Sequence, residues 1–194
     1  MTLIAVQIAL PAIPGGSDST DASVLFQHLD DIEGAFIGFF VAFVVLARYW
    51  ITNHSFFDAL AAIDAGMVVR QIAYLMVVVL LPFAAKLVGE YEENPGAVVV
   101  FAVLLALLSN LETVLLRHAA KARLFRRHQP NATELRWATI SSSAPVITFL
   151  GTLPLAWIDT SFAMVSWIVV GPSIGFLVTR LAPDGALAWT KHLT

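Results

Sequence analysis

The chain of 194 residues contains no cysteine, and only 13% of its residues are charged. The absence of cysteine excludes disulfide bonds and thiolate metal sites. A soluble domain is nearer to about 25% charged, whereas this chain is 58% hydrophobic and has a mean hydropathy of +0.80. These values predict an integral membrane protein with a single membrane domain, residues 1–194, and no second globular domain.

The sequence also lacks the motifs of the common enzyme and nucleic-acid-binding classes. It contains no Gly-rich phosphate loop, no catalytic triad and no nucleic-acid-binding patch. Its histidines and carboxylates do not cluster with the spacing of metal ligands. We therefore expect no catalytic residues, no metal site, no cofactor and no nucleic-acid partner.

Six apolar stretches separated by polar turns predict an all-α, six-helix transmembrane bundle. The expected helices cover residues 1–13, 34–53, 67–88, 96–116, 137–158 and 161–182. The first is too short to cross a bilayer core of ~30 Å at ~1.5 Å per residue. It also lacks the basic start and the cleavage site of a signal peptide. We interpret it as an incomplete helix 1, of which about two turns would precede Met1 in the native chain.

The charged residues are divided unevenly between the two ends of the predicted helices. Residues 14–33, the connection after residue 88, and Asp159 form a side with nine acidic residues and one base, Lys86. The other ten basic residues lie on the opposite side. Because basic residues accumulate on the cytoplasmic side, this pattern predicts that the N- and C-termini are both cytoplasmic.

A set of motifs in the first half of the chain resembles a known family. The sequence reads Tyr49-Trp50, then His54, Phe56-Phe57 and Asp64, and later Leu80-Leu81-Pro82-Phe83 and Gly89-Glu90. This order resembles the bacterial single-repeat form of the transmembrane protein 175 family of potassium channels. In that family helix 1 opens with an arginine and a Phe-Ser-Asp motif, which would lie before Met1 here. Residues 1–6 are similar to the apolar second half of that helix.

The resemblance implies a homotetramer around a central pore lined by helix 1. It implies a potassium-conducting channel, with other monovalent cations possible, in the lipid of a bacterial plasma membrane. The chain has no carbonyl filter of the Thr-Val-Gly-Tyr-Gly type, so selection would depend on a hydrophobic constriction. We expect Thr2 and Val6 to face the pore and Leu3 and Leu10 to form the constriction. These residues lie on adjacent stripes of helix 1, and the sequence leaves open which stripe faces the pore. The alternative is that these side chains make ordinary packing contacts with lipid or with other helices.

Three residues are candidates for a polar network that braces the helices: Trp50, His54 and Gln71. The resemblance implies that His54 braces helix 1. Trp50 and His54 could equally lie at the headgroup level as an interfacial anchor. Gln71 is an amide within a predicted span, where it needs a partner.

Glu112 supports an alternative function. A carboxylate within a span, together with prolines and glycines in the last two helices, is typical of a secondary transporter or proton-coupled carrier. Glu112 could also form a simple ion pair with Arg117, about one turn away. The basic run 117–127 could bind anionic lipids or only set the orientation. A membrane subunit without a transport role is the third interpretation.

Overall fold

The computed structural model describes residues 33–91, 93–188 and 190, and every named element within them is a helix. The elements are α3 (Glu33–Asp58), α4 (Ala65–Glu90), α5 (Pro95–Lys121), α6 (Ala132–Gly151), the short 3₁₀ helix η2 (Leu153–Trp157) and α7 (Thr160–Leu181). Four stretches are long and apolar enough to cross a membrane: Ala65–Glu90, Pro95–Lys121, Ala132–Trp157 and Thr160–Leu181. The all-α membrane class is therefore confirmed for this part of the chain. The predicted helix 1–13 lies outside the described residues.

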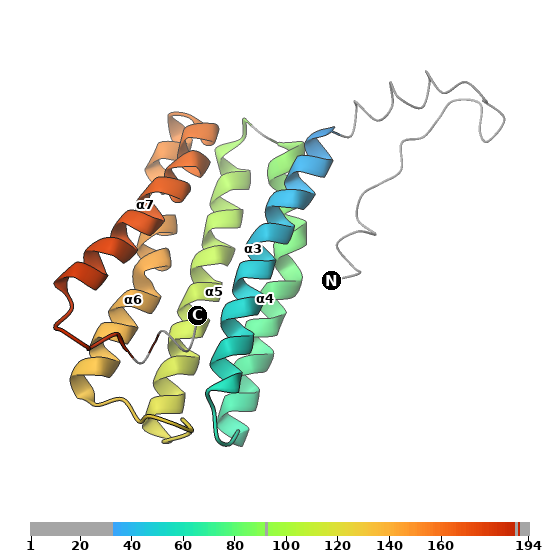
Figure 1. Ribbon diagram of the computed structural model, residues 1–194. Coiled ribbons are helices and arrows are strands. Elements are labelled where there is room, and N and C mark those ends of the chain that lie inside the picture. Colours follow the sequence, from blue (N-terminus) through green and yellow to red (C-terminus); the bar gives the residue numbers. More distant parts are fainter. Residues whose placement is uncertain (1–32, 92, 189, 191–194) are drawn as a thin grey trace.

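The helices run alternately up and down, so that helices adjacent in sequence lie side by side (Figure 1). α5 is the central helix, because it contacts α4, α6, η2 and α7. Small buried residues on α5, including Ala102 and Ala106, let the neighbouring helices approach closely. The bottom of Figure 1 holds both the α3–α4 connection, residues 59–64, and the α5–α6 connection, residues 122–131, and we call it the lower end.

Side-chain caps fix where the helices from α4 to α7 begin. Asp64 accepts a hydrogen bond from the Met67 N–H at the start of α4. Asn94, followed by Pro95, caps α5, and Asp159 caps α7. Short polar side chains at these positions satisfy backbone donors that the helix itself leaves unpaired.

α3 is longer than predicted. The expected helix ended at residue 53, but α3 continues to Asp58. The reason is that its last turn makes specific contacts: Phe56 is buried against Phe125, and His54 lies four residues from Asp58 with 3.7 Å between Nε2 and Oδ2. The helix thus extends more than one turn past its predicted end.

α6 differs from prediction at both ends. It begins at Ala132 rather than at residue 137, because Asn131 and Glu134 form a capping box. It ends at Gly151 rather than at residue 158, and the chain continues as the 3₁₀ helix η2. Pro154 explains the break, since proline cannot donate the backbone hydrogen bond that an α-helix requires.

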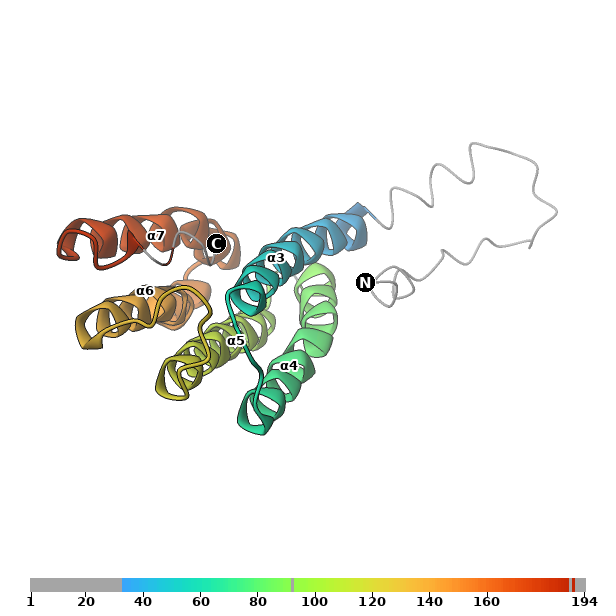
Figure 2. The same ribbon diagram turned by 60° about the horizontal axis from the view of Figure 1, so that its bottom comes forward.

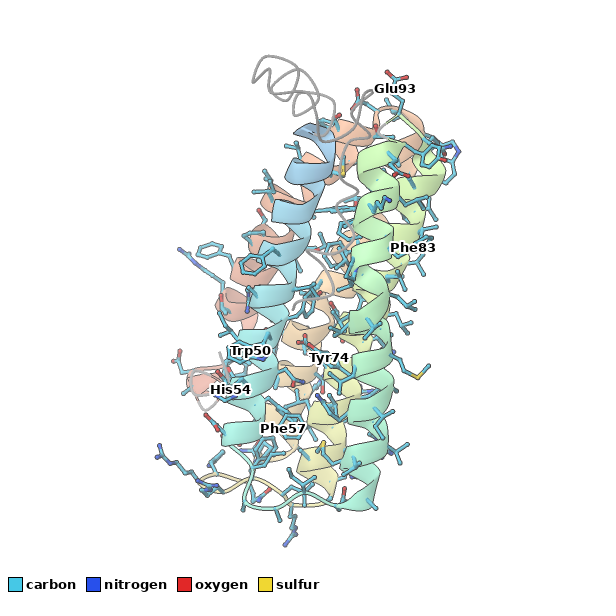
Figure 3. The ribbon with its side chains drawn as sticks, turned by 90° about the vertical axis from the view of Figure 1, so that its right-hand side faces the viewer. Trp50, His54, Phe57, Tyr74, Phe83 and Glu93 are labelled. Carbon is cyan, nitrogen blue, oxygen red and sulfur yellow. The ribbon has the colours of Figure 1, made fainter. Side chains whose placement is uncertain are left out.

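The outer helices present apolar side chains away from the core. On α4 the exposed positions repeat at three- and four-residue intervals and are Val68, Val69, Ile72, Leu75, Met76, Val79, Leu80 and Phe83. Figure 3 shows Phe83 projecting from α4. α7 is likewise mostly exposed, at Val165, Ile168 and Val169 among others. Such faces are unfavourable in water but suited to lipid or to a neighbouring subunit.

Candidate functional site

Buried hydroxyl groups join α3, α4 and α5. Tyr49 Oη on α3 lies 2.6 Å from Ser109 Oγ on α5. Because Ser109 Oγ donates to the Leu105 carbonyl, the Tyr49 hydroxyl is the donor to Ser109. Tyr74 on α4 donates from Oη to the Tyr49 carbonyl at 3.3 Å. A single residue of α3 therefore contacts both neighbouring helices.

A reciprocal amide pair lies next to these hydroxyls. Asn53 Nδ2 donates to Gln71 Oε1 at 3.3 Å, and Gln71 Nε2 donates to Asn53 Oδ1 at 3.0 Å. Asn53 follows Tyr49 by four residues and Gln71 precedes Tyr74 by three, so each pair shares one helix face. We call Tyr49, Asn53, Gln71, Tyr74 and Ser109 the polar cluster. It fixes the register of α3 against α4, since each interhelical hydrogen bond contributes ~0.6–2 kcal/mol in a membrane.

The sequence predicted Gln71 as an amide that needs a partner, but Asn53 was not among the predicted residues. The signal that could have found it is its spacing. Asn53 is a polar residue on the Tyr49 face of α3, and two amides that face each other across two helices can each donate one N–H to the oxygen of the other.

Trp50 and His54 lie on a different face of α3. Their rings stack with centroids 5.2 Å apart and 4° between planes. Trp50 is 59% exposed, and Figure 3 shows both side chains on the side of α3 away from α4. Among the described residues they contact their own helix, so their role in bracing helix 1 stays a prediction.

Glu112 lies on α5, three residues after Ser109 and thus on the same face. Its Oε1 is buried without a hydrogen-bond partner in the described part of the chain. Arg117, the partner expected from the sequence, instead donates from Nε to Thr139 Oγ1 on α6 at 3.5 Å. An unpaired carboxyl oxygen inside a bundle is costly, which makes Glu112 a candidate for function.

Further hydroxyl contacts hold the second half of the bundle. Thr113 Oγ1 on α5 and Ser142 Oγ on α6 lie 2.7 Å apart. Trp167 on α7 donates from Nε1 to Thr152 Oγ1 at 2.8 Å, where α6 gives way to η2. α5 therefore has polar contacts to the helices on both of its sides.

At the lower end, Asp64 ties the start of α4 to the end of α5. Its Oδ1 accepts from the Met67 N–H at 2.6 Å, and His118 Nε2 lies 2.9 Å from Oδ1 and 3.0 Å from Oδ2. The hydrogen bond from His118, followed by that from Met67, holds the pKa of Asp64 below its usual range. Gly66 makes this approach possible, because a Cβ there would lie 2.7 Å from His118 Cε1.

The predicted pore residues Thr2, Leu3, Val6 and Leu10 lie outside the described residues. The described part of the chain brings no three His, Cys, Asp or Glu side chains close enough together to hold a metal ion. The structure therefore describes the helices that follow the predicted pore segment in the chain.

An up-and-down bundle of membrane-length helices, joined by buried polar contacts, defines a multi-pass membrane protein. Residues 1–82 match the family described as the endosomal/lysosomal potassium channel TMEM175. This match supports the family predicted from the sequence, and that family is one of ion channels and not of enzymes.

A solved structure has a similar fold: the crystal structure of a lysosomal potassium-selective channel TMEM175 homolog from Chamaesiphon minutus. The TM-score is 0.68 at 19% sequence identity, and the likeness covers 91% of this chain and 89% of that one. At this identity the likeness concerns the fold. A search among curated proteins found no match.

Proposed function

We propose that the protein is a potassium-conducting cation channel that assembles as a homotetramer. The observation that carries this proposal is the family match over residues 1–82, because it includes the apolar stretch 1–13 expected to line the pore. The fold shared with a potassium-selective channel homolog supports it.

In the proposed channel, helix 1 of each subunit contributes Thr2 and Val6 to the pore and Leu3 and Leu10 to a constriction. A ring of aliphatic side chains resists wetting, so that small shifts of the helix open or close the path for ions. A threonine hydroxyl beside the ring can contact a partly dehydrated cation. No cofactor is required, and K⁺ or another monovalent cation is the transported species.

The described helices support this pore helix in the proposal. The polar cluster fixes α3, α4 and α5 as one unit, since its hydrogen bonds link all three helices. Trp50 and His54, exposed on α3, are available to helix 1. The bases at the lower end would face the cytoplasm of a bacterial cell, with the protein in its plasma membrane.

The test is ion flux through the purified full-length protein in liposomes, with any native residues upstream of Met1 included. We expect K⁺ flux that follows the electrochemical gradient without a coupling ion. Leu3→Ser and Val6→Ser should raise the leak and weaken discrimination between cations, because a hydroxyl lets water enter the constriction. Absence of K⁺ flux at every voltage would overturn the channel proposal, and unchanged conductance in both variants would argue against a pore lined by helix 1.

Glu112 favours a second candidate function, a secondary transporter or proton-coupled carrier. Its buried, unpaired Oε1 and the break between α6 and η2 are the observations behind it. A carrier gives saturable flux that depends on a proton gradient and is abolished by Glu112→Gln. Flux that is linear in driving force and persists in Glu112→Gln excludes this candidate.

A further inference from the structure

Four cations lie close together in the chain, at the end of α5 and on the connection between α5 and α6 at the lower end. They are Lys121, Arg123, Arg126 and Arg127, and all four are exposed. We call them the basic surface. The described part of the chain gives none of them a carboxylate partner within ion-pair distance.

The backbone that carries the basic surface is held in place. Phe125 is 6% exposed and packs edge-on against Phe56 of α3, with ring centroids 6.2 Å apart. The Arg126 N–H donates to the Ala59 carbonyl at 2.9 Å, and the Ala61 N–H donates to the Leu124 carbonyl at 2.7 Å. The two connections of the lower end are therefore joined to each other, as their positions in Figure 2 also show.

Arg123 has a left-handed backbone conformation, with φ of 56°. This conformation is unfavourable for a residue with a long side chain. It is held by hydrogen bonds from the Arg123 N–H to the Ala120 carbonyl and from the Leu124 N–H to the Ala119 carbonyl. The turn sends the chain back under the bundle, so that Leu124 and Phe125 point inward while the flanking cations remain in solvent.

Three carboxylates on the helix ends that meet at the lower end each have a histidine nearby. Asp64 pairs with His118 at 2.9 Å, and Glu134 pairs with His128 at 2.9 Å and also caps α6. Asp58 lies 3.7 Å from His54. In the described part of the chain, none of these acids forms an ion pair with the lysine or the three arginines of the basic surface.

The basic surface also lies where lipid headgroups begin. α5 has 27 residues, and at ~1.5 Å per residue it is longer than a bilayer core of ~30 Å. The connection leads directly into another membrane-length stretch, Ala132–Trp157, so it stays close to the membrane plane. Long cationic side chains at such a position reach the phosphate layer.

We propose that Lys121, Arg123, Arg126 and Arg127 bind the phosphate groups of anionic phospholipids in the adjacent leaflet. The inference concerns the membrane surface of the protein and does not depend on ion conduction. Each cation at a membrane surface should raise the preference for an anionic over a zwitterionic lipid by about fivefold.

The test uses native mass spectrometry of the purified protein, with phosphatidylglycerol and phosphatidylcholine in competition. We expect wild type to retain phosphatidylglycerol preferentially. In the triple variant Arg123→Gln/Arg126→Gln/Arg127→Gln, the preference for phosphatidylglycerol over phosphatidylcholine should be at least tenfold weaker. The matched control is Arg48→Gln/Lys86→Gln/Arg180→Gln, which removes the same charge from other parts of the described chain. It should keep most of the wild-type preference.

Three results would overturn the proposal: an unchanged preference in the triple variant, an equal loss in the control variant, or displacement of the lipid by inorganic phosphate at equal concentration. The last result would assign the surface to a free phosphate. If the triple variant does not fold, the salt dependence of the wild-type protein still tests the proposal. Its preference for phosphatidylglycerol must fall steeply with added salt. A preference that does not change with salt contradicts an electrostatic site.

Discussion

At the scale of single residues, the contact between the start of α4 and the end of α5 depends on a glycine. Gly66, in the first turn of α4, leaves room for the His118 ring, and His118 in turn reaches Asp64. Nothing in the sequence marked Gly66 or His118, because their positions matter only once α4 and α5 are packed. Asp64 was noticed only as part of a motif.

Gly66→Ala should therefore destabilise the protein by about 1 kcal/mol or more. The new Cβ would lie 2.7 Å from His118 Cε1 and 2.9 Å from Nε2, so the ring must move away from Asp64. Thermal unfolding in detergent measures the effect. Gly175→Ala is the control, because no atom lies within 4 Å of a Cβ built there. Equal melting temperatures for the two variants would contradict this account of Gly66.

The Asp64–His118 contact should also make stability depend on pH. The pKa of Asp64 is lowered in the folded protein, chiefly by His118, so its stabilising effect is present above the usual carboxylate range and is lost as pH falls through the lowered value. Asp64→Asn removes the charge but keeps a good helix cap.

Unfolding midpoints of wild type and Asp64→Asn should therefore differ most near neutral pH and converge in acid. Asp58→Asn, at a side chain 75% exposed, removes the same charge outside the Asp64–His118 contact and serves as the control. If the difference in unfolding midpoint between wild type and Asp64→Asn grew in acid, the predicted direction of the pH dependence would be wrong.

At the scale of elements, hydrophobic length predicted where most helices lie, because membrane spans need long apolar stretches. The ends were less predictable. The α3 extension depends on Phe56 meeting Phe125, a contact far apart in sequence. The start of α6 was predictable in principle, since Asn131 and Glu134 have capping-box spacing. The amide pair could not be derived from Gln71 alone, because its partner depends on the register of α3 against α4.

The Asn53–Gln71 pair should contribute a measurable coupling between α3 and α4. A double-mutant cycle with Asn53→Ala and Gln71→Ala should give a coupling free energy of about 0.5–1.5 kcal/mol in detergent unfolding. Each single variant leaves one amide unpaired, so the destabilisations of the two single variants should add up to more than that of the double variant. The cycle of Asn53→Ala with Ser142→Ala, on the distant α6, serves as control and should be additive. If the two effects in the Asn53–Gln71 cycle were additive, the pair would not help to fix the register of α3 against α4.

At the scale of the whole molecule, the two ends of the bundle differ in charge. The upper connection between α4 and α5 contains Glu93 and follows Glu90, whereas the lower end carries the basic surface. The sequence alone predicted this division, because the charges of each connection can be counted without knowing how the helices pack. The predicted pore residues Thr2, Leu3, Val6 and Leu10 lie outside the described residues, so their role stays a prediction.

The charge division predicts that the lower end faces the cytoplasm. The absence of cysteine makes this directly testable, because every introduced thiol is the only one in the chain. Glu93→Cys, labelled in Figure 3 at the upper end, should react with a membrane-impermeant maleimide added outside intact cells. Gln129→Cys, exposed on the α5–α6 connection, should react only after the cells are opened. Both sites react equally once the membrane is dissolved, which controls for thiol reactivity. The reverse pattern would place the basic surface outside the cell and, with it, invert the proposed orientation of the channel.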